Sequence, residues 1–375
     1  MRAAVDGRQA AHRPRRAWRA LMLAALALGG CAAPGAQAPP SALPSPSPAA
    51  ATPAPTAVPA PPAPGVRPAQ AGAPGALRTP DFVAVTARAG DTLESLAAAW
   101  LGDPARAWEI AEYNGVAAAA PGQELAIPLK PFRLGGLTAE RYQTVPVLVY
   151  HQFGEKSANR MTVSREAFEA QMRLLREKGY RVIPLAQLVA FAEYRAQLPE
   201  KSVVITIDDG WRTMYDIAFP ILRKYGYPAT LFVYTQLISG GAKTLSWDQV
   251  REMAEQGLDV QCHTVTHRNL ALQQEGESAE QYFAAVRREI GEATGLIEQK
   301  TGRRPTVLAY PYGETNGLAI ELLRRQGYRA AFTVEREANP FFAPTFRLGR
   351  SMIYGDYDLA RFEKNLAVSD RQALR

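Results

Sequence analysis

The chain has 375 residues, 47% of them hydrophobic, and is therefore long enough to hold two or three globular domains. Its net charge is +7, but residues 1–30 contain six arginines and one aspartate, which leaves only +2 for the rest of the chain. Because the basic excess is confined to the N-terminus, a nucleic-acid-binding surface is not expected.

The N-terminus has the layout of an export signal. Arginines precede an apolar run at residues 20–28, which is too short to remain as a membrane-spanning helix. The sequence Leu-Gly-Gly-Cys that ends at Cys31 resembles the lipobox of bacterial lipoproteins. This resemblance implies a signal peptide at residues 1–30, lipidation of Cys31 and an exported protein anchored in the outer membrane, facing the periplasm. A plain signal peptide cleaved near Ala38 is the alternative.

Residues 31–80 are predicted to be a disordered tether. Residues 32–80 contain 15 of the 29 prolines of the chain, together with many alanines. A segment of this composition cannot bury enough apolar surface to offset the entropy lost on ordering, and proline keeps it extended.

Residues 81–130 have a different pattern, which predicts a small strand–helix–helix–strand module. A strand is expected at 82–86, a helix from Glu94 that is capped by Asp91 or Thr92, a second helix through Trp108, and a closing strand at 125–128. The sequences Ala-Gly-Asp-Thr-Leu at 89–93, Asn-Gly at 114–115 and Pro-Gly-Gln-Glu-Leu at 121–125 resemble the LysM module. The resemblance implies binding to N-acetylglucosamine-containing chains such as peptidoglycan. A degenerate copy that serves only as a spacer is the alternative.

From residue 140 to 375, apolar runs alternate with amphipathic stretches. The runs predict seven strands, at residues 145–150, 181–183, 203–207, 229–234, 258–262, 306–310 and 330–334. Helices are predicted between them, for example at 164–178 and from a capping box at 246–249. The alternation predicts an α/β domain with a parallel sheet, most simply a single distorted (β/α)7–8 barrel.

Polar residues that could bind a metal or transfer a proton follow these predicted strands. The chain has four histidines, and the three outside the signal peptide all lie at or just after strand ends. Because a barrel brings the carboxyl ends of its strands to one face, these groups are expected to converge there. They are His151, the pair Asp208 and Asp209, His263 and His267, and the sequence Pro311-Tyr312-Gly313. A carboxylate with two imidazoles suits Zn²⁺ or a similar divalent ion. Taken alone, Asp-Asp-Gly would favour an ordinary turn.

Three motifs of the large domain resemble the polysaccharide deacetylase family, also called NodB-homology or carbohydrate esterase family four. They are Ile-Thr-Ile-Asp-Asp-Gly at 205–210, His-Thr-Val-Thr-His at 263–267 and, in part, Ala-Tyr-Pro-Tyr-Gly at 309–313. The resemblance implies that Asp209, His263 and His267 bind the metal, expected to be Zn²⁺, and that Asp208 is the catalytic base. It also implies that the backbone N–H of Tyr312 helps to stabilise the oxyanion.

The chain departs from the family pattern at two points. Ala309 stands where the family usually has an arginine that orients the catalytic aspartate, and no histidine follows His267 to supply the usual general acid. Both departures resemble the branch that deacetylates poly-N-acetylglucosamine. By that resemblance His151 is the candidate general acid, with a structural hydrogen bond as the alternative. Arg350 is a candidate for steadying Asp208, although an ordinary surface arginine is favoured.

The sequence thus supports two main hypotheses. The first is a metal-dependent hydrolase that removes N-acetyl groups from an N-acetylglucosamine-containing polysaccharide, held at the membrane by its lipid and near peptidoglycan by the LysM module. The second is a catalytically inactive wall-binding lipoprotein, and a metal-dependent hydrolase of another N-acyl or O-acetyl group is a further alternative. Peptidoglycan and an exopolysaccharide both remain candidate substrates.

Overall fold

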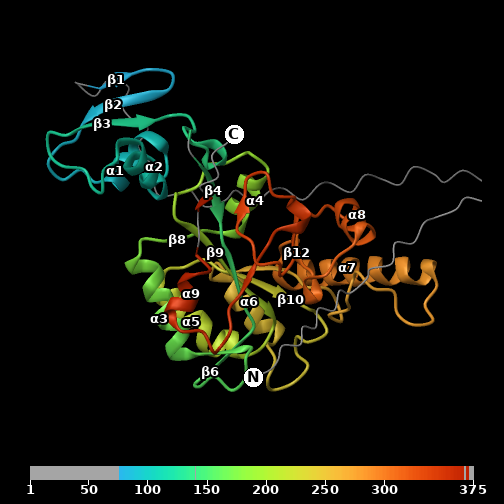
Figure 1. The fold of residues 1–375 in the computed structure, drawn as a ribbon. Coiled ribbons are helices and arrows are strands. Elements are labelled where there is room, and N and C mark those ends of the chain that lie inside the picture. Colours follow the sequence, from blue (N-terminus) through green and yellow to red (C-terminus); the bar gives the residue numbers. More distant parts are fainter. Residues whose placement is uncertain (1–75, 140, 367–368, 371–375) are drawn as a thin grey trace, which may run out of the picture. The chain divides into compact units, whose positions relative to one another are not determined.

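The computed structural model describes residues 76–139, 141–366 and 369–370 (Figure 1). The predicted signal peptide, the lipidation site Cys31 and the proline-rich segment as far as residue 75 lie outside the described residues. Within the described part of the chain, no helix combines the length and apolar character needed to cross a membrane.

The small N-terminal module has the predicted order of elements. Thr92 caps the first helix and forms a capping box with Ser95, and the left-handed Gly102 ends that helix. One short strand that pairs with the next was not predicted, and it lies just before residue 81, where the module was expected to begin. The elements are β1 (Leu77–Arg78), β2 (Phe82–Thr86), α1 (Leu93–Leu101), η1 (Pro104–Arg106), α2 (Ala107–Asn114) and β3 (Glu124–Pro128). The three strands form an antiparallel sheet in the order β1-β2-β3.

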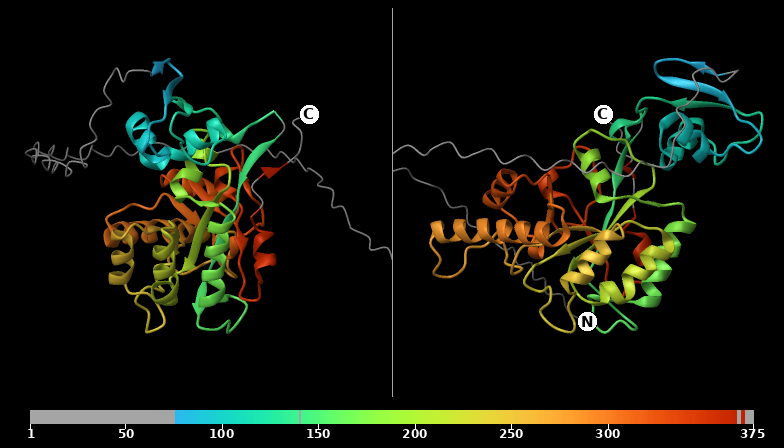
Figure 2. Two further views of the ribbon diagram at one scale, coloured as in Figure 1. Left: turned by 90° about the vertical axis from the view of Figure 1, so that its left-hand side faces the viewer. Right: turned by 180° about the vertical axis from the view of Figure 1, so that it is seen from behind.

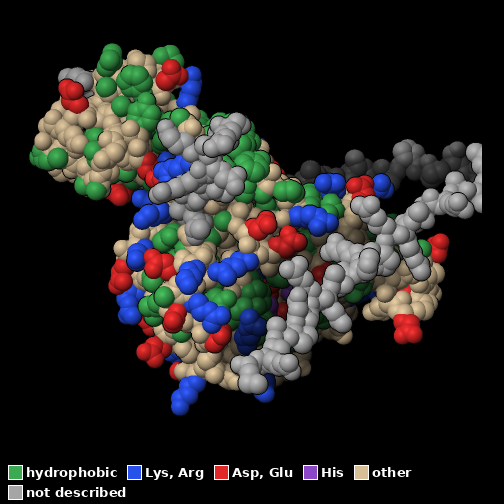
Figure 3. Space-filling model, in the orientation of Figure 1, with side chains coloured by type: hydrophobic (Ala, Val, Ile, Leu, Met, Phe, Trp, Pro, Cys, Tyr) green, Lys and Arg blue, Asp and Glu red, His purple; other side chains and the backbone are tan. Residues whose placement is uncertain are grey.

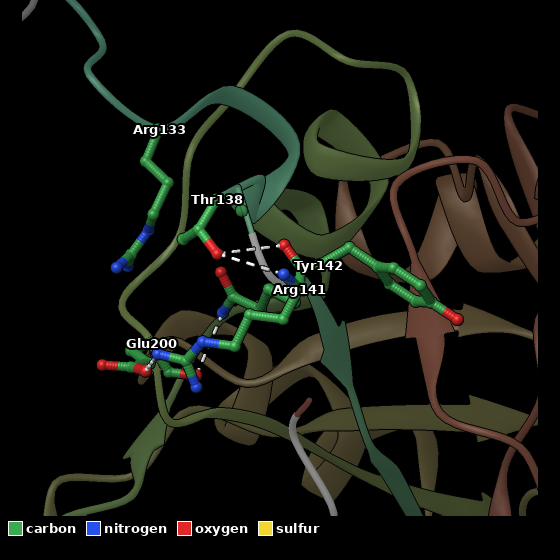
Figure 4. A pocket seen from close by; sticks show the side chains of 7 residues that line it. Arg133, Thr138, Arg141, Tyr142 and Glu200 are labelled. Carbon is green, nitrogen blue, oxygen red and sulfur yellow. Dashed lines mark hydrogen bonds and ion pairs between the residues drawn. The ribbon is translucent and has the colours of Figure 1, made fainter. Parts of the chain in front are cut away.

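The segment that leads into the large domain is fixed by polar contacts. It contains the short helix η2 (Leu134–Gly136) and the strand β4 (Tyr142–Val145). Figure 4 shows the Arg141 side chain directed toward Glu200, with which it forms an ion pair, while the ring of Tyr142 points the other way. The Thr138 hydroxyl bonds the backbone of Arg141, and the Gln143 amide donates to the carbonyl oxygen of Pro199 at 2.6 Å. These contacts order the entry to the first strand of the central sheet.

The large domain is built on a parallel sheet whose strands have the order β13-β12-β11-β10-β9-β5-β15, with β8 paired to the start of β9 (Figure 1). All seven predicted strands are present in their expected places. Their bounds are β5 (Val147–Tyr150), β8 (Arg181–Val182), β9 (Ser202–Asp209), β10 (Thr230–Val233), β11 (Asp259–Cys262), β12 (Val307–Ala309) and β13 (Ala330–Phe332). An eighth strand, β15 (Ser351–Met352), was not among the seven predicted ranges. Strand β9 is mostly apolar and is buried on both faces from Ser202 to Asp208, as expected for a central parallel strand.

Helices surround this sheet (Figures 1 and 2). The predicted capping box is confirmed, because Ser246 and Gln249 cap α6, and Ser164 caps α3 at the start of the predicted helix. The helices are α3 (Arg165–Glu177), α4 (Leu185–Ala192), η3 (Met214–Ala218), α5 (Phe219–Tyr225), α6 (Trp247–Glu255), α7 (Ala279–Thr301), η4 (Pro311–Gly313), α8 (Gly317–Arg325), η5 (Thr345–Arg347) and α9 (Leu359–Glu363). Short strands outside the central sheet are β6 (Gln152–Gly154), β7 (Thr162–Ser164), β14 (Asn339–Pro340) and β16 (Ser369–Asp370).

The two edges of the curled sheet are connected by the segment that carries β15. At its start, Leu348 forms a parallel bridge with Phe332 of β13, and further on Ser351 pairs with Leu148 of β5. The same stretch of chain therefore contacts both ends of the sheet, which confirms the distorted α/β barrel. The order of the strands differs from a simple barrel because β8 is short and β5 pairs directly with β9.

Candidate metal and catalytic site

The strand ends bring the predicted residues into one cavity. Strand β9 ends at Asp208 and Asp209, β11 is followed by the loop that holds His263 and His267, and β5 is followed by His151. The cavity has a volume of about 360 Å³, within the usual range of small-molecule sites, roughly 300–1,000 Å³. It is lined by His151, Met161, Asp208, Asp209, His263, His267, Tyr310, Tyr312, Gly313, Val334, Arg350, Met352 and Tyr354. In Figure 3 a histidine side chain is visible in a hollow of the domain, with basic side chains on the surface nearby.

Arg350 lies on the connecting segment and is fully buried, so the expectation of a surface arginine is wrong. Its guanidinium donates to both carboxylate oxygens of Asp208, with Nη1 2.7 Å from Oδ1 and Nη2 2.8 Å from Oδ2. Nε donates to the carbonyl oxygen of Thr333 at 3.1 Å. The rings of Phe232 and Phe332 lie 5.5 and 5.8 Å from the guanidinium carbon and keep water away from the pair. A bidentate hydrogen-bonded contact of this kind fixes the plane of the carboxylate.

Two opposing effects act on the Asp208 carboxyl. Burial raises its pKa, since a charge is poorly solvated inside the protein, whereas Arg350, with further contributions from His263 and His151, lowers it. The net result is a pKa below the ordinary value of an aspartate. Asp208 is therefore ionised at neutral pH and able to accept a proton.

Asp209, His263 and His267 form a cluster suited to a metal ion. Each contributes one ligand atom, and these atoms all lie within 4.8 Å of one another. Asp209 Oδ1 is 3.8 Å from Nε2 of His263 and 3.8 Å from Nε2 of His267. Donor atoms around a tetrahedral zinc ion lie roughly 3.3–3.5 Å apart, given bonds of about 2.0–2.1 Å. The observed separations are wider than this, but the donor set of one carboxylate and two imidazoles is one that suits a divalent transition metal.

The orientation of His263 is set by the backbone of β12. Its Nδ1 lies 2.7 Å from the carbonyl oxygen of Ala309, which can only accept a hydrogen bond, so Nδ1 carries the proton. The lone pair on Nε2 then faces Asp209. Burial lowers the pKa of this imidazole, although Asp208 and Asp209 oppose the effect. A neutral ring with a free Nε2 is the form that binds metal.

Strained backbone is concentrated at this site. Six described residues other than glycine have positive φ angles, and four of them are Asp209, Thr264, His267 and Tyr312. The glycine of the third motif is also required by its surroundings. Gly313 has a φ of +75°, and a Cβ there would lie 2.6 Å from the backbone nitrogen of Val334. Such conformations persist only where surrounding contacts hold them, and they cluster at functional sites.

The remaining predicted residues lie at the open side of the cavity. Tyr312 is 63% exposed, and its ring packs edge-on against that of His267, with the ring centres 4.8 Å apart. His151 is half-buried on the cavity wall directly after β5. The roles of Tyr312 as an oxyanion donor and of His151 as a general acid stay predictions.

Sequence reasoning missed one residue that holds the metal-ligand loop. Glu289 of α7 is buried and accepts hydrogen bonds from the backbone N–H groups of Val265 and Thr266, both at 2.9 Å, and from the Thr266 hydroxyl at 2.8 Å. A signal for it was present, since Glu289 interrupts the apolar stripe that Val286 and Ile290 form on this helix. One carboxylate thus fixes the loop between the two histidines.

Replacing Glu289 with alanine should weaken metal binding by about 10- to 100-fold, the usual effect of losing a residue that supports metal ligands. Two backbone donors would lose their charged acceptor, so the free energy of unfolding should also fall by about 2–4 kcal/mol. Chelator competition and denaturant unfolding measure the two effects. Glu292→Ala, at an exposed glutamate of the same helix, is the control. Equal behaviour of the two variants would contradict the role of Glu289.

The large domain is also similar in sequence to known proteins. Residues 195–331 match the model of the polysaccharide deacetylase family. The poly-beta-1,6-N-acetyl-D-glucosamine N-deacetylase of Staphylococcus epidermidis is 28% identical over 208 residues, which are 54% of this chain and 72% of that protein. The enzyme of the same name from Escherichia coli (strain K12) is 29% identical over 222 residues. That match covers 50% of this chain but only 33% of the E. coli protein.

A solved structure shares the fold of the large domain. The structure of IcaB from Ammonifex degensii superposes with a TM-score of 0.54 at 26% identity, and the match covers 61% of this chain and 100% of that one. The structural match shows the fold of the large domain, which contains the residues 195–331 that match the family model. Neither comparison tests the LysM resemblance of the N-terminal module.

Proposed function

We propose that the large domain, in which residues 195–331 match the model of the polysaccharide deacetylase family, hydrolyses N-acetyl groups of an N-acetylglucosamine-containing polysaccharide and releases acetate. The observation that carries the proposal is the pairing of a metal-binding cluster with a second carboxylate in one cavity. Asp209 joins the two histidines, while Asp208 is held separately by Arg350. The two acids are thus available for different tasks, ligation and proton transfer.

In the proposed hydrolysis of the amide, each residue has a separate role. A divalent cation, proposed to be Zn²⁺, would be held by Asp209, His263 and His267 and would polarise the carbonyl group of the substrate. Asp208 accepts a proton from water as the water oxygen bonds to the carbonyl carbon. The N–H of Tyr312 donates to the carbonyl oxygen as negative charge develops on it. His151 protonates the nitrogen as the C–N bond breaks, so the products are acetate and a free amine on the sugar.

Two polymers are candidate substrates, poly-β-1,6-N-acetylglucosamine and peptidoglycan. The E. coli and staphylococcal relatives are named for poly-β-1,6-N-acetylglucosamine, and the replacement of the motif arginine by Ala309 fits that branch. The LysM-like module favours peptidoglycan as the polymer near which the enzyme is held. The module can locate the enzyme at the wall without contacting its substrate.

We further propose that the protein is exported and anchored to the outer membrane through Cys31. This proposal rests on the lipobox-like sequence that ends at Cys31 and on the arginine-rich, apolar segment before it. Incorporation of a labelled fatty acid into the full chain, and its loss in Cys31→Ser, is the measurement that decides it.

Removing the metal should abolish acetate release, and adding back Zn²⁺ should restore it. Acetate is measured with poly-β-1,6-N-acetylglucosamine and with peptidoglycan side by side, before and after treatment with a chelator. Asp209→Ala, which removes the carboxylate ligand, should stay inactive after Zn²⁺ is added. If the protein binds metal but releases acetate from neither polymer, the proposed activity is wrong and the inactive wall-binding protein is favoured.

A further inference from the structure

Asp209 has two carboxylate oxygens that face different partners. Oδ1 lies toward the two histidines, 3.8 Å from each Nε2. Oδ2 accepts a hydrogen bond of 2.9 Å from the indole N–H of Trp211, two residues further along the chain. The carboxylate is therefore oriented by a group that is not itself a candidate metal ligand.

The chemistry of the indole makes it suited to this task. Its N–H can donate a hydrogen bond but offers no lone pair to a metal, so it cannot compete with the histidines for the ion. While Oδ2 is engaged, only Oδ1 is directed into the metal cluster. A carboxylate that binds through one oxygen, together with two imidazoles, leaves coordination positions for water and substrate.

The position of Trp211 is fixed by its own backbone. Trp211 forms an antiparallel bridge with Thr244. On either side of it, the N–H of Arg212 donates to the carbonyl oxygen of Lys243 at 3.0 Å, and the N–H of Leu245 donates to that of Gly210 at 2.9 Å. The indole thus projects from a segment that is attached to the 243–245 loop. It can hold Asp209 in the left-handed backbone conformation, with a φ of +78°, that the aspartate adopts.

We propose that Trp211 is a positioning residue for the metal site, whose indole N–H holds Oδ2 of Asp209 so that the carboxylate presents a single oxygen to a divalent cation. The inference rests on the proposed metal site and adds a residue to it. Trp211 supports the ligand and takes no part in bond making or breaking.

The test compares Trp211→Phe, which keeps an aromatic ring but removes the N–H, with Trp247→Phe. Trp247 begins helix α6 and packs against the hydrophobic core, so its replacement controls for the loss of an indole. The affinity of the metal-free full chain for Zn²⁺ and Co²⁺ is measured by chelator competition. Trp211→Phe should bind both ions about 10- to 100-fold more weakly than wild type, while Trp247→Phe should bind them as wild type does.

Visible absorption of bound Co²⁺ gives a second readout, which a purely structural role would not change. The absorption intensity falls as the coordination number rises, so Trp211→Phe should absorb more weakly if Asp209 becomes free to bind through both oxygens. If Trp211→Phe does not fold, a tryptophan isostere with sulfur in place of N–H at position 211 provides the same comparison with the ring shape retained.

The outcomes separate this inference from the function on which it rests. Wild-type affinity and an unchanged Co²⁺ spectrum in the variant that lacks the N–H would overturn the role of Trp211 and leave the metal site intact. A wild-type chain that binds neither ion would overturn the metal site itself, and the inference with it.

Discussion

Replacing Arg350 with methionine should abolish deacetylation and lower the free energy of unfolding by about 3–5 kcal/mol. Methionine fills much of the space but cannot neutralise Asp208, which would remain buried without a partner. Without Arg350 the effect of burial dominates, so the pKa of Asp208 should rise and any residual activity should be lost at higher pH than in wild type. Denaturant unfolding and the pH profile of acetate release measure these effects.

The control for Arg350 is the double variant Arg350→Met with Asp208→Asn. It removes both charges, so it should recover much of the lost stability while remaining inactive. Arg350→Lys keeps a positive charge but cannot reproduce the two parallel hydrogen bonds, so its activity should be intermediate. If Arg350→Met kept wild-type stability and activity, the guanidinium would have no role in orienting the base.

The ion pair also makes a contribution to stability that depends on pH. The folded-state pKa of Asp208 lies below its ordinary value. Its contribution is therefore present above the ordinary aspartate pKa and is lost as the pH falls through the lower, folded value. At neutral pH the contribution is complete.

Replacing His151 with alanine should lower kcat on the N-acetylated polymer by about 10²- to 10⁴-fold, the usual range for loss of a general acid. The amine product leaves poorly unless its nitrogen is protonated, whereas the phenolate released from 4-nitrophenyl acetate needs no proton. Hydrolysis of that ester should therefore change little. The ratio of the two activities is the diagnostic measurement.

Metal content provides the control for His151. This residue is not part of the Asp209, His263 and His267 cluster, so His151→Ala should bind metal as wild type does. An equal loss of activity on both substrates, or no loss on the polymer, would contradict the assignment of His151 as general acid.

The positions of the candidate metal-binding and catalytic residues could be predicted because each follows a strand with a strong local pattern. The run at 203–207 predicts a buried parallel strand, and such a strand places Asp208 and Asp209 at the edge where neighbouring strands also end. The same argument places His263 after β11 and His151 after β5. Once these strands pair in a curled parallel sheet, their ends must converge.

The contacts of the supporting residues could not be predicted in the same way. Arg350 is 142 positions from Asp208 in the sequence, and Glu289 is 23 positions from Thr266. Trp211 is only two positions from Asp209, but the direction of its side chain depends on pairing with the 243–245 segment. In each case the local pattern gives no information on the partner.

The sequence by itself determined the seven predicted strands, the helices named between them, and the carboxylates and histidines that meet at the barrel edge. These follow from local hydrophobic periodicity, capping residues and the shared direction of parallel strands. Only the tertiary structure decided that Arg350 pairs with Asp208, since that depends on the segment from Leu348 to Met352 contacting both edges of the sheet. Closure of the sheet is a property of the packed domain. It brings together residues that are far apart in the sequence, and no local pattern indicates that they will meet.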